Sequence, residues 1–301
     1  MRVLFATDGS EFSEEAARFL TRLSFSETDE IIILHVISEI PYDDDYHAQV
    51  KHAIRKVAPK ILASSARILR PVKAQVATLE KDGYPDTAIV DMAITANADM
   101  IVMGARGVRG VKLLILGSST RAVAINSPVP VLVVKHPSWN NPEGMNVLFA
   151  TDGSDSANDA GRFLSSLPVP EEAELTVMNI SLSAVSDIPE KYAAELGLLI
   201  KEESEMAGAI TSGRGESIIE EAKGFLGSRF HKINQLTTLG DPFREILAAE
   251  KRLKPDIIVV GCRGLRGFRG MLGSVSRRLL SHSESSLLIG KTCAKVAASP
   301  E

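Results

Sequence analysis

A long repeat in the pattern of apolar and polar positions organises this sequence. The segment MRVLFATDGSEFSEEAARFLTRL at residues 1–23 returns as MNVLFATDGSDSANDAGRFLSSL at residues 145–167, with VLFATDGS unchanged. After each DGS, apolar residues recur at the i, i+3, i+4 and i+7 spacing of an amphipathic helix. These positions are Ala16, Phe19, Leu20 and Leu23 in the first copy, and Ala160, Phe163, Leu164 and Leu167 in the second. Because the preceding VLF is typical of a strand covered on both faces, each copy begins as strand, turn and helix.

The same kind of reasoning extends along both copies. In the first, the pattern predicts further strands at 31–37, 72–79, 99–104 and 129–136, and helices at 47–69, 86–96 and 112–125. In the second, it predicts strands at 174–180, 232–240, 256–261 and 286–291. The interval 187–228 fits least well, and TSGRGE at 211–216 predicts a mobile break between two shorter helices. Alternating strands and helices predict an α/β fold with parallel sheets and helices on both faces.

The length of the repeat indicates duplicated domains rather than a short solenoid unit. The chain has 301 residues, which suits two domains of ordinary size. Proline and asparagine are dense in PSWNNPEG at 137–144. We therefore predict domains at 1–137 and 145–293, a linker at 138–144 and a C-terminal tail at 294–301.

Composition narrows the class of protein. Hydrophobic residues make up 45% and charged residues 24% of the chain, as in globular proteins. The net charge of −4 offers no positive excess for nucleic acid, so none is expected as a partner. Apolar runs such as IIILHV fall short of the roughly 18 residues that a membrane span needs, and the N-terminus lacks the layout of a secretory signal. We expect a cytoplasmic protein with no membrane partner and with Cys262 and Cys293 reduced.

Two loops carry the candidate chemistry, because open parallel sheets bind ligands beyond the carboxyl ends of their strands. One follows the first strand and holds Asp8, matched by Asp152. The other follows the fourth strand and reads G-x2-G-x9-G-S. Glycine lets main-chain N–H groups approach an anion, and a helix start favours negative charge. Arg106, Arg109 and Lys112 add positive charge there, so the loop predicts a phosphate site. The alternative, that the glycines serve only turns and helix packing, stays open.

Taken in order, ATDGS, HVIS, the glycine–proline turn before the third helix and G-x2-G-x9-G-S resemble the universal stress protein (UspA) family in a tandem form. The resemblance covers nearly the whole chain. It implies two tandem open five-stranded parallel sheets of strand order 3-2-1-4-5, which pair through their fifth strands within the chain. It also implies an adenine nucleotide, ATP with or without Mg²⁺, or AMP or ADP, bound between strands one and four.

The resemblance and the charge of the loop together define the expected nucleotide-binding residues. In the first copy they are Ala6, Thr7, Asp8, Val36, Met103, Gly104, Arg106, Gly107, Gly117, Ser118 and Ser119. In the second copy they are Asp152, Ile180, Gly261, Gly264, Gly273, Ser274 and Val275.

The second copy departs from the family spacing, because Gly264 and Gly273 are separated by eight residues instead of nine. A deletion inside the helix would turn everything beyond it by about 100°, so that Ser274 would face away from the phosphates. A deletion inside the loop could instead leave the orientation of the helix and of Ser274 unchanged. We expect the first site to be the stronger one.

These observations favour an ATP-binding regulatory protein of the stress response with little or no turnover. Groups that could donate hydrogen bonds to phosphate are present, but there is no evident general base and no pair of carboxylates for a metal ion. No catalytic residue is therefore assigned, although slow hydrolysis stays open. The six histidines show no metal-binding spacing, and His35 is expected to be a buried, hydrogen-bonded imidazole. One alternative is a nucleotide-free interaction scaffold. Another is an ATP-consuming ligase or nucleotidyl transferase. Protein partners and further dimerisation stay undecided.

Overall fold

The computed structural model describes residues 1–39, 45–107, 116–135, 144–181, 213–264 and 272–291. Several predictions concern residues outside these ranges. They include Arg109, Lys112, Cys293, the tail and all of the linker except Gly144.

Each half of the chain alternates strands and helices. The first half contains β1 (Arg2–Ala6), α1 (Glu11–Leu20), β2 (Glu30–Ser38), α2 (Asp45–Ile68), β3 (Gln75–Gly83), α3 (Pro85–Thr95), β4 (Met100–Gly104), α4 (Ser118–Asn126) and β5 (Val131–Val134). The second half contains β6 (Asn146–Thr151), α5 (Asp155–Ser166), β7 (Glu174–Ser181), β8 (Lys232–Leu239), α8 (Pro242–Leu253), β9 (Ile257–Gly261), α9 (Ser274–His282) and β10 (Ser286–Gly290). A further helix covers residues 213–226 and precedes β8.

Three local predictions need correction. The helix expected at 112–125 begins only at Ser118, because Gly117 before it has extended backbone, with ψ 142°. The third strand was expected at 72–79, but β3 begins at Gln75, because Val72 donates its N–H to the Leu69 carbonyl at 3.0 Å in the turn that follows α2. The strand then continues to Gly83, which pairs with Ser38 of β2. Residues 213–216, expected to lie in a break, form the first turn of a helix.

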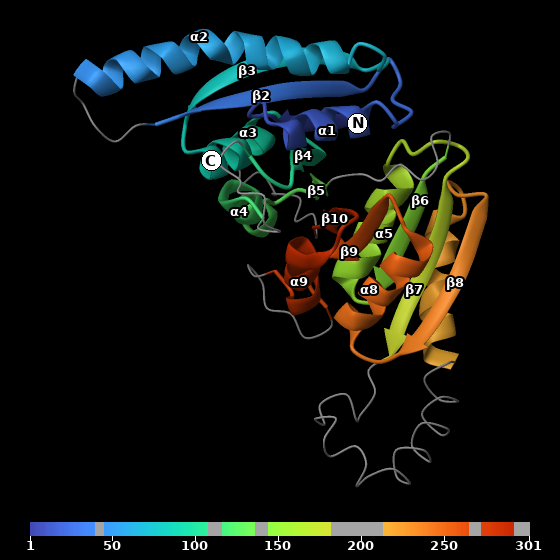
Figure 1. The fold of residues 1–301 in the computed structure, drawn as a ribbon. Helices are drawn as coiled ribbons and strands as arrows, with labels where there is room; N and C mark the ends of the chain where they lie inside the picture. The colour runs from blue at the N-terminus through green and yellow to red at the C-terminus, as the bar shows by residue number, and fades with distance from the viewer. Residues whose placement is uncertain (40–44, 108–115, 136–143, 182–212, 265–271, 292–301) are drawn as a thin grey trace, which may run out of the picture.

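All ten of these strands form one sheet, in the order β3-β2-β1-β4-β5-β10-β9-β6-β7-β8. Within each half the strands are parallel and follow the predicted order 3-2-1-4-5. The halves meet where β5 pairs antiparallel with β10, with Leu132 opposite Leu288. Figure 1 shows the two halves on either side of this junction. The predicted fold class and the pairing of fifth strands within the chain are both confirmed.

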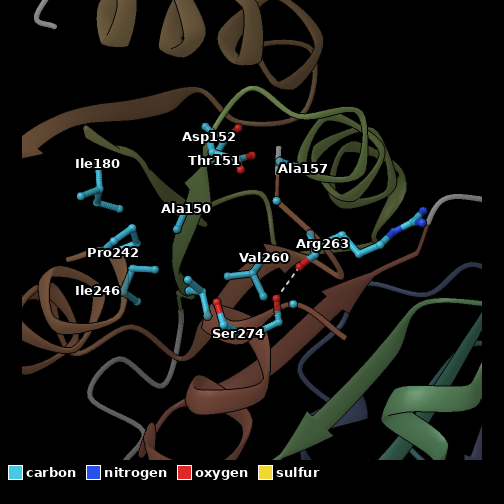
Figure 2. Close-up of a pocket in the computed structure, with 15 residues that line it drawn as sticks. Ala150, Thr151, Asp152, Ala157, Ile180, Pro242, Ile246, Val260, Arg263 and Ser274 are labelled. Carbon is cyan, nitrogen blue, oxygen red and sulfur yellow. Dashed lines mark hydrogen bonds between the residues drawn. The ribbon is translucent and has the colours of Figure 1, made fainter. Parts of the chain in front are cut away.

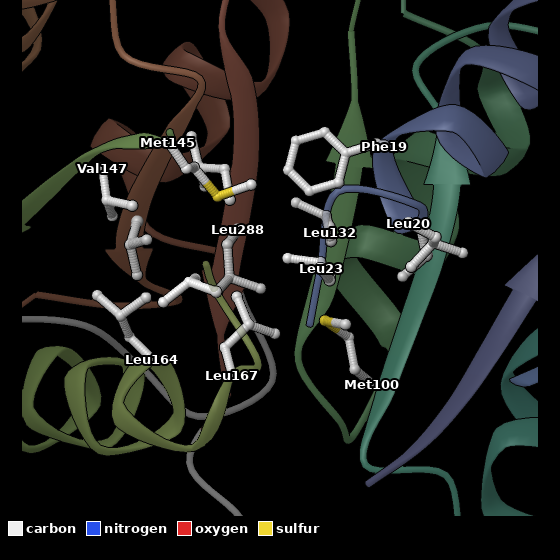
Figure 3. Packing of buried hydrophobic residues seen from close by; sticks show 14 of the residues in the cluster. Phe19, Leu20, Leu23, Met100, Leu132, Met145, Val147, Leu164, Leu167 and Leu288 are labelled. Carbon is white, nitrogen blue, oxygen red and sulfur yellow. The ribbon is translucent and has the colours of Figure 1, made fainter. Parts of the chain in front are cut away.

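The hydrophobic core continues across the junction. On one face of the sheet it runs from Phe5 and Phe19 through Leu132 and Leu288 to Phe149. Figure 3 shows Phe19, Leu23 and Leu132 close to Leu288, where the two halves meet. A second core, which includes Leu4, Val133, Ile289 and Leu148, covers the other face. Burying these side chains stabilises both halves together at roughly 25 cal/mol per Å² of apolar surface.

A buried ion pair adds to the junction. Arg22, just beyond α1, lies 3.1 Å from Asp256, just before β9, and only 14% and 3% of their side chains are exposed. The same carboxylate accepts the Asn146 N–H at 2.7 Å.

Among the described residues, no helix combines the length and apolarity that crossing a membrane requires.

Candidate functional site

The turn after the first strand of each half holds an aspartate in a fixed position. Asp8 Oδ1 accepts the Ser10 N–H at 3.0 Å and the Ser10 hydroxyl at 2.6 Å. The Ser10 side chain in turn caps α1. In the second half, Asp152 Oδ1 accepts the Ser154 N–H at 3.0 Å, and Ser154 caps α5. These short-range bonds place a carboxylate at the carboxyl edge of the sheet in both halves.

A buried polar side chain of the second strand ties this turn to its neighbour. His35 is 7% exposed, and its Nδ1 lies 2.9 Å from the Thr7 carbonyl. Because a carbonyl can only accept, Nδ1 carries the proton. In the second half, Asn179 donates its amide N–H to the Thr151 carbonyl at 2.9 Å. His35 is therefore a hydrogen-bonded core residue, as predicted, and the Asn179 amide makes the corresponding hydrogen bond in the second half.

Four of the loop glycines have a steric reason within the chain. A Cβ on Gly104 would lie 2.7 Å from the main chain of Phe12, and one on Gly261 would lie 2.8 Å from that of Ser156. A Cβ on Gly107 or Gly264 would come within 3.0 Å of the aspartate carboxylate in the same half. Close packing against main chain therefore accounts for Gly104 and Gly261, as the alternative interpretation of the loop requires, whereas at Gly107 and Gly264 the contact is with a side chain that can shift.

Gly117 is different. Its φ of −60° is one that any residue adopts. A Cβ there would have its nearest contact at 3.4 Å, which is ordinary van der Waals distance. The packing of the described chain thus gives no reason for glycine at this position, whereas close approach of a ligand to the main chain would give one.

The helix that follows each loop starts in the same way in both halves. Gly117 donates its N–H to the Ala105 carbonyl at 2.9 Å, and Gly273 donates to the Cys262 carbonyl at 2.7 Å. One turn on, the Thr120 hydroxyl bonds to the Gly104 carbonyl at 3.0 Å. Its counterpart in the second half is a 2.6 Å bond from the Ser276 hydroxyl to the Gly261 carbonyl.

These matched bonds decide where the missing residue of the second loop falls. Both sides of the loop keep the register of the first half, so the deletion lies between Gly264 and Leu272. The rotation of the helix that a deletion within it would cause does not occur. Ser274 stands at the first position of α9, as Ser118 does in α4. The first N–H groups of both helices have no acceptor within the helix, so both helix starts are suited to an anion.

A cavity of about 150 Å³ lies beside the start of α9 in the second half. Figure 2 shows its lining side chains. One part is apolar and is formed by Ala150, Ile180, Pro242, Ile246 and Val260. The other is polar and includes Asp152, Arg263, Gly264, Gly273 and Ser274; Thr151, Ala157, Gly261, Val275 and Ser276 complete the lining. An apolar recess that opens onto a helix N-terminus suits a molecule with a flat apolar end and an anionic end.

Sequence reasoning named much of this lining but missed part of it. Pro242 and Ile246 belong to the first turns of α8, four residues apart, and their first-half counterparts are Pro85 and Ile89. The glycine–proline turn was recognised only as a helix start. Its position after the edge strand was the available signal that this helix faces the carboxyl end of the sheet.

The first-half residues occupy the same structural positions. Ala6 and Met103 are buried at the ends of β1 and β4, and Val36 lies near the end of β2. The Arg106 guanidinium lies 5.1 Å from the centre of the Phe12 ring, a stacking contact that holds a positive charge beside the loop. The predicted residues of each half therefore gather at one edge of the sheet.

Among the described residues, no three His, Cys, Asp or Glu side chains gather closely enough to hold a metal ion. Cys262 is buried, with its Sγ 3.2 Å from the Ser156 hydroxyl. Its first-half counterpart is Ala105, so the thiol fills a small buried position.

Comparisons with known proteins agree with this architecture. The Universal stress protein family matches residues 1–135 and 145–291. A universal stress protein of Mycolicibacterium smegmatis is 24% identical over 300 residues, covering 95% of this chain and 96% of the relative. One of Synechocystis is 33% identical over 133 residues, covering 44% of this chain and 83% of the relative. The solved structure of a universal stress protein from Archaeoglobus fulgidus has a TM-score of 0.64 at 24% identity, covering 96% of this chain and 98% of that one.

Proposed function

Because this chain belongs to the universal stress protein family, we propose that it is a regulatory protein of the stress response that binds ATP or another adenine nucleotide with little or no turnover. The proposal extends to both halves, with one nucleotide site in each.

The observation that supports it most is the cavity of the second half. Its apolar wall, which includes Ile180, Pro242 and Ile246, suits an adenine ring. The start of α9 suits the phosphates, because its first N–H groups, beginning with that of Ser274, have no acceptor within the helix and the helix dipole favours negative charge there. Asp152 also lines the cavity, and its carboxylate suits a ribose hydroxyl, from which it would accept a hydrogen bond.

The corresponding residues would hold a nucleotide in the first half. They are Ala6, Thr7, Asp8, Val36, Met103, Gly104, Arg106, Gly107, Gly117, Ser118 and Ser119. The room around Gly117 supports this assignment, because the phosphates would explain a glycine that chain packing does not. A Mg²⁺ ion would bind mainly through the phosphates, since the described residues bring together no carboxylate cluster for it.

The two sites are not identical. The shortened second loop no longer argues for a weaker second site, because the helix start keeps its register. A different contrast does: Ser119 of the first half offers a hydroxyl where the second half has Val275. A hydrogen bond to a charged group contributes about 1.5–3 kcal/mol, so the first site is still expected to bind phosphate more tightly.

Titration calorimetry with ATP, ADP, AMP and GTP tests the proposal, combined with mass analysis of any nucleotide that co-purifies. We expect adenine nucleotides to bind and to raise Tm, and GTP to bind more weakly. Phosphate release should stay near the uncatalysed rate. Absence of binding with millimolar ATP, in protein shown to be empty, would contradict the proposal and favour the interaction scaffold. That second candidate draws support from Gly104 and Gly261, which packing against main chain explains.

A further inference from the structure

Two buried lysines cross the junction between the halves. Lys135 directly follows β5 and is 9% exposed, and Lys291 directly follows β10 and is 8% exposed. The Lys135 ammonium donates to the Leu279 carbonyl at 3.1 Å and to the carbonyl and hydroxyl of Ser283 at 2.7 and 3.0 Å. The Lys291 ammonium donates to the Ala124 and Ile125 carbonyls at 2.8 and 3.1 Å. Each lysine therefore binds the last turn of a helix that belongs to the other half.

The helices held in this way are the two that begin at the candidate phosphate sites. Lys291 of the second half binds the end of α4, which starts at Ser118, and Lys135 of the first half binds the end of α9, which starts at Ser274. Figure 1 shows α4 and α9 on opposite sides of the junction, near β5 and β10. Each helix has nine residues, so its two ends are about 13 Å apart.

A cation at the carboxyl end of a helix and an anion at its amino end act on the same peptide dipoles. The cation satisfies carbonyls that have no partner within the helix and holds the helix in place. The contribution is larger in a buried, partly desolvated site than at an exposed one, because salt screens it less. Because the direct effect of a terminal charge falls off within about one turn, each lysine would act on the anion site chiefly by holding the helix in position.

Other charges reinforce the link between the sites. Burial lowers the pKa of Lys135 to about 8, while the Glu250 carboxylate on α8 raises it and Arg106 lowers it. Burial also lowers the pKa of Lys291, with Cys262 acting to raise it and Arg263 to lower it. Each lysine thus lies within electrostatic reach of the arginine in its own half's loop and in contact with the helix of the other half.

We propose that Lys135 and Lys291 are positioning residues for the anion site of the opposite half, so that neither half has a complete site alone. The proposal rests on the proposed function, since it assigns nucleotide phosphates to the starts of α4 and α9. Nothing in the repeated sequence motifs requires it, because both lysines lie outside the loops that would touch the ligand.

The experiment compares Lys135→Met and Lys291→Met with Lys251→Met, a control that removes an exposed lysine from α8. Two measurements are made on the full chain. Hydrogen exchange without nucleotide follows the amides of 118–126 and 274–282 separately. Titration with ATP is followed by NMR at the amides of Gly117 and Gly273, which report the two sites one by one.

Each methionine variant is expected to affect the half opposite to the one that carries the mutation, a pattern called crossed below. Lys291→Met should speed exchange in α4 about tenfold and weaken ATP binding at Gly117 about 3- to 10-fold, and leave α9 and Gly273 unchanged. Lys135→Met should do the reverse, and the control should change neither. Should a methionine variant fail to fold, Lys135→Gln and Lys291→Gln keep a donor for the carbonyls and remove only the charge.

The outcomes separate this inference from the proposed function. Equal effects on both helices, or effects confined to the half that carries the mutation, would overturn it and leave the lysines as general supports of the junction. Crossed exchange effects in a protein that binds no ATP would uphold the structural link and refute nucleotide binding. Crossed exchange without crossed ATP effects, in a protein that does bind ATP, would overturn the link between lysine and anion site.

Discussion

Replacing Gly117 by alanine separates the structural and the ligand-binding explanations of the glycine-rich loop. The added Cβ would meet Thr120 Oγ1 at 3.4 Å and the Ala105 carbonyl oxygen at 3.5 Å, so the chain has room for it. The backbone at φ −60° needs no adjustment. Glycine is a better N-cap than alanine, but alanine also lowers the entropy of the unfolded chain.

These two effects oppose each other, so the free energy of unfolding should change by less than about 1 kcal/mol. For a chain of this size that corresponds to a shift in Tm of about 3 °C or less. A phosphate at the start of α4 would, in contrast, be pushed outward by the methyl group. Loss of one charge-assisted hydrogen bond, about 1.5–3 kcal/mol, weakens ATP binding at the first site about 10- to 100-fold.

Gly104→Ala is the matched control for stability. Its Cβ would lie 2.7 Å from the carbonyl carbon and oxygen of Phe12, so α1 must move, at a cost of about 1–3 kcal/mol. Thermal unfolding and ATP calorimetry are measured on both variants and on the wild type. The reasoning is refuted if Gly117→Ala keeps wild-type stability and also keeps wild-type ATP affinity at the first site, because the phosphates would then not approach this helix start.

Three further predictions concern the fold. His35→Asn should lower the free energy of unfolding in urea by less than about 1 kcal/mol, because Asn179 makes the same bond in the second half. His35→Leu leaves a buried carbonyl unpaired and should lower it by about 1–3 kcal/mol. Equal losses in the two variants would contradict this reasoning. The pKa of Lys135 is about 8 in the folded chain and 10.5 in the unfolded chain, so between these pH values the unfolded chain binds more protons. The free energy of unfolding should therefore rise by about 3 kcal/mol from pH 8 to pH 10.5 in the wild type but not in Lys135→Met. Arg22→Leu leaves the buried Asp256 carboxylate without its cation and should lower the free energy of unfolding by about 3 kcal/mol at pH 7; a loss below about 1 kcal/mol would argue against the ion pair.

Local patterns in the sequence were enough to predict the duplicated α/β fold and the edge of the sheet where a ligand is proposed to bind. Short-range patterns suffice for this, since the apolar spacing after DGS predicts a helix and VLF predicts a covered strand. Asp8 and Gly104 could be placed together because parallel strands bring their carboxyl ends to one edge. The strand order and the pairing of fifth strands followed from the family resemblance.

Tertiary structure alone decided several features that a motif cannot reveal. The effect of the shortened second loop depended on which carbonyls Gly273 and Ser276 contact, and these lie 11 and 15 residues away in sequence. The apolar wall around Ile246 required knowledge of which way α8 faces. The bonds of Lys135 join residues 144 and 148 positions apart. Such contacts follow from how the two halves pack, because local periodicity determines which face of an element is buried but not which distant group it meets.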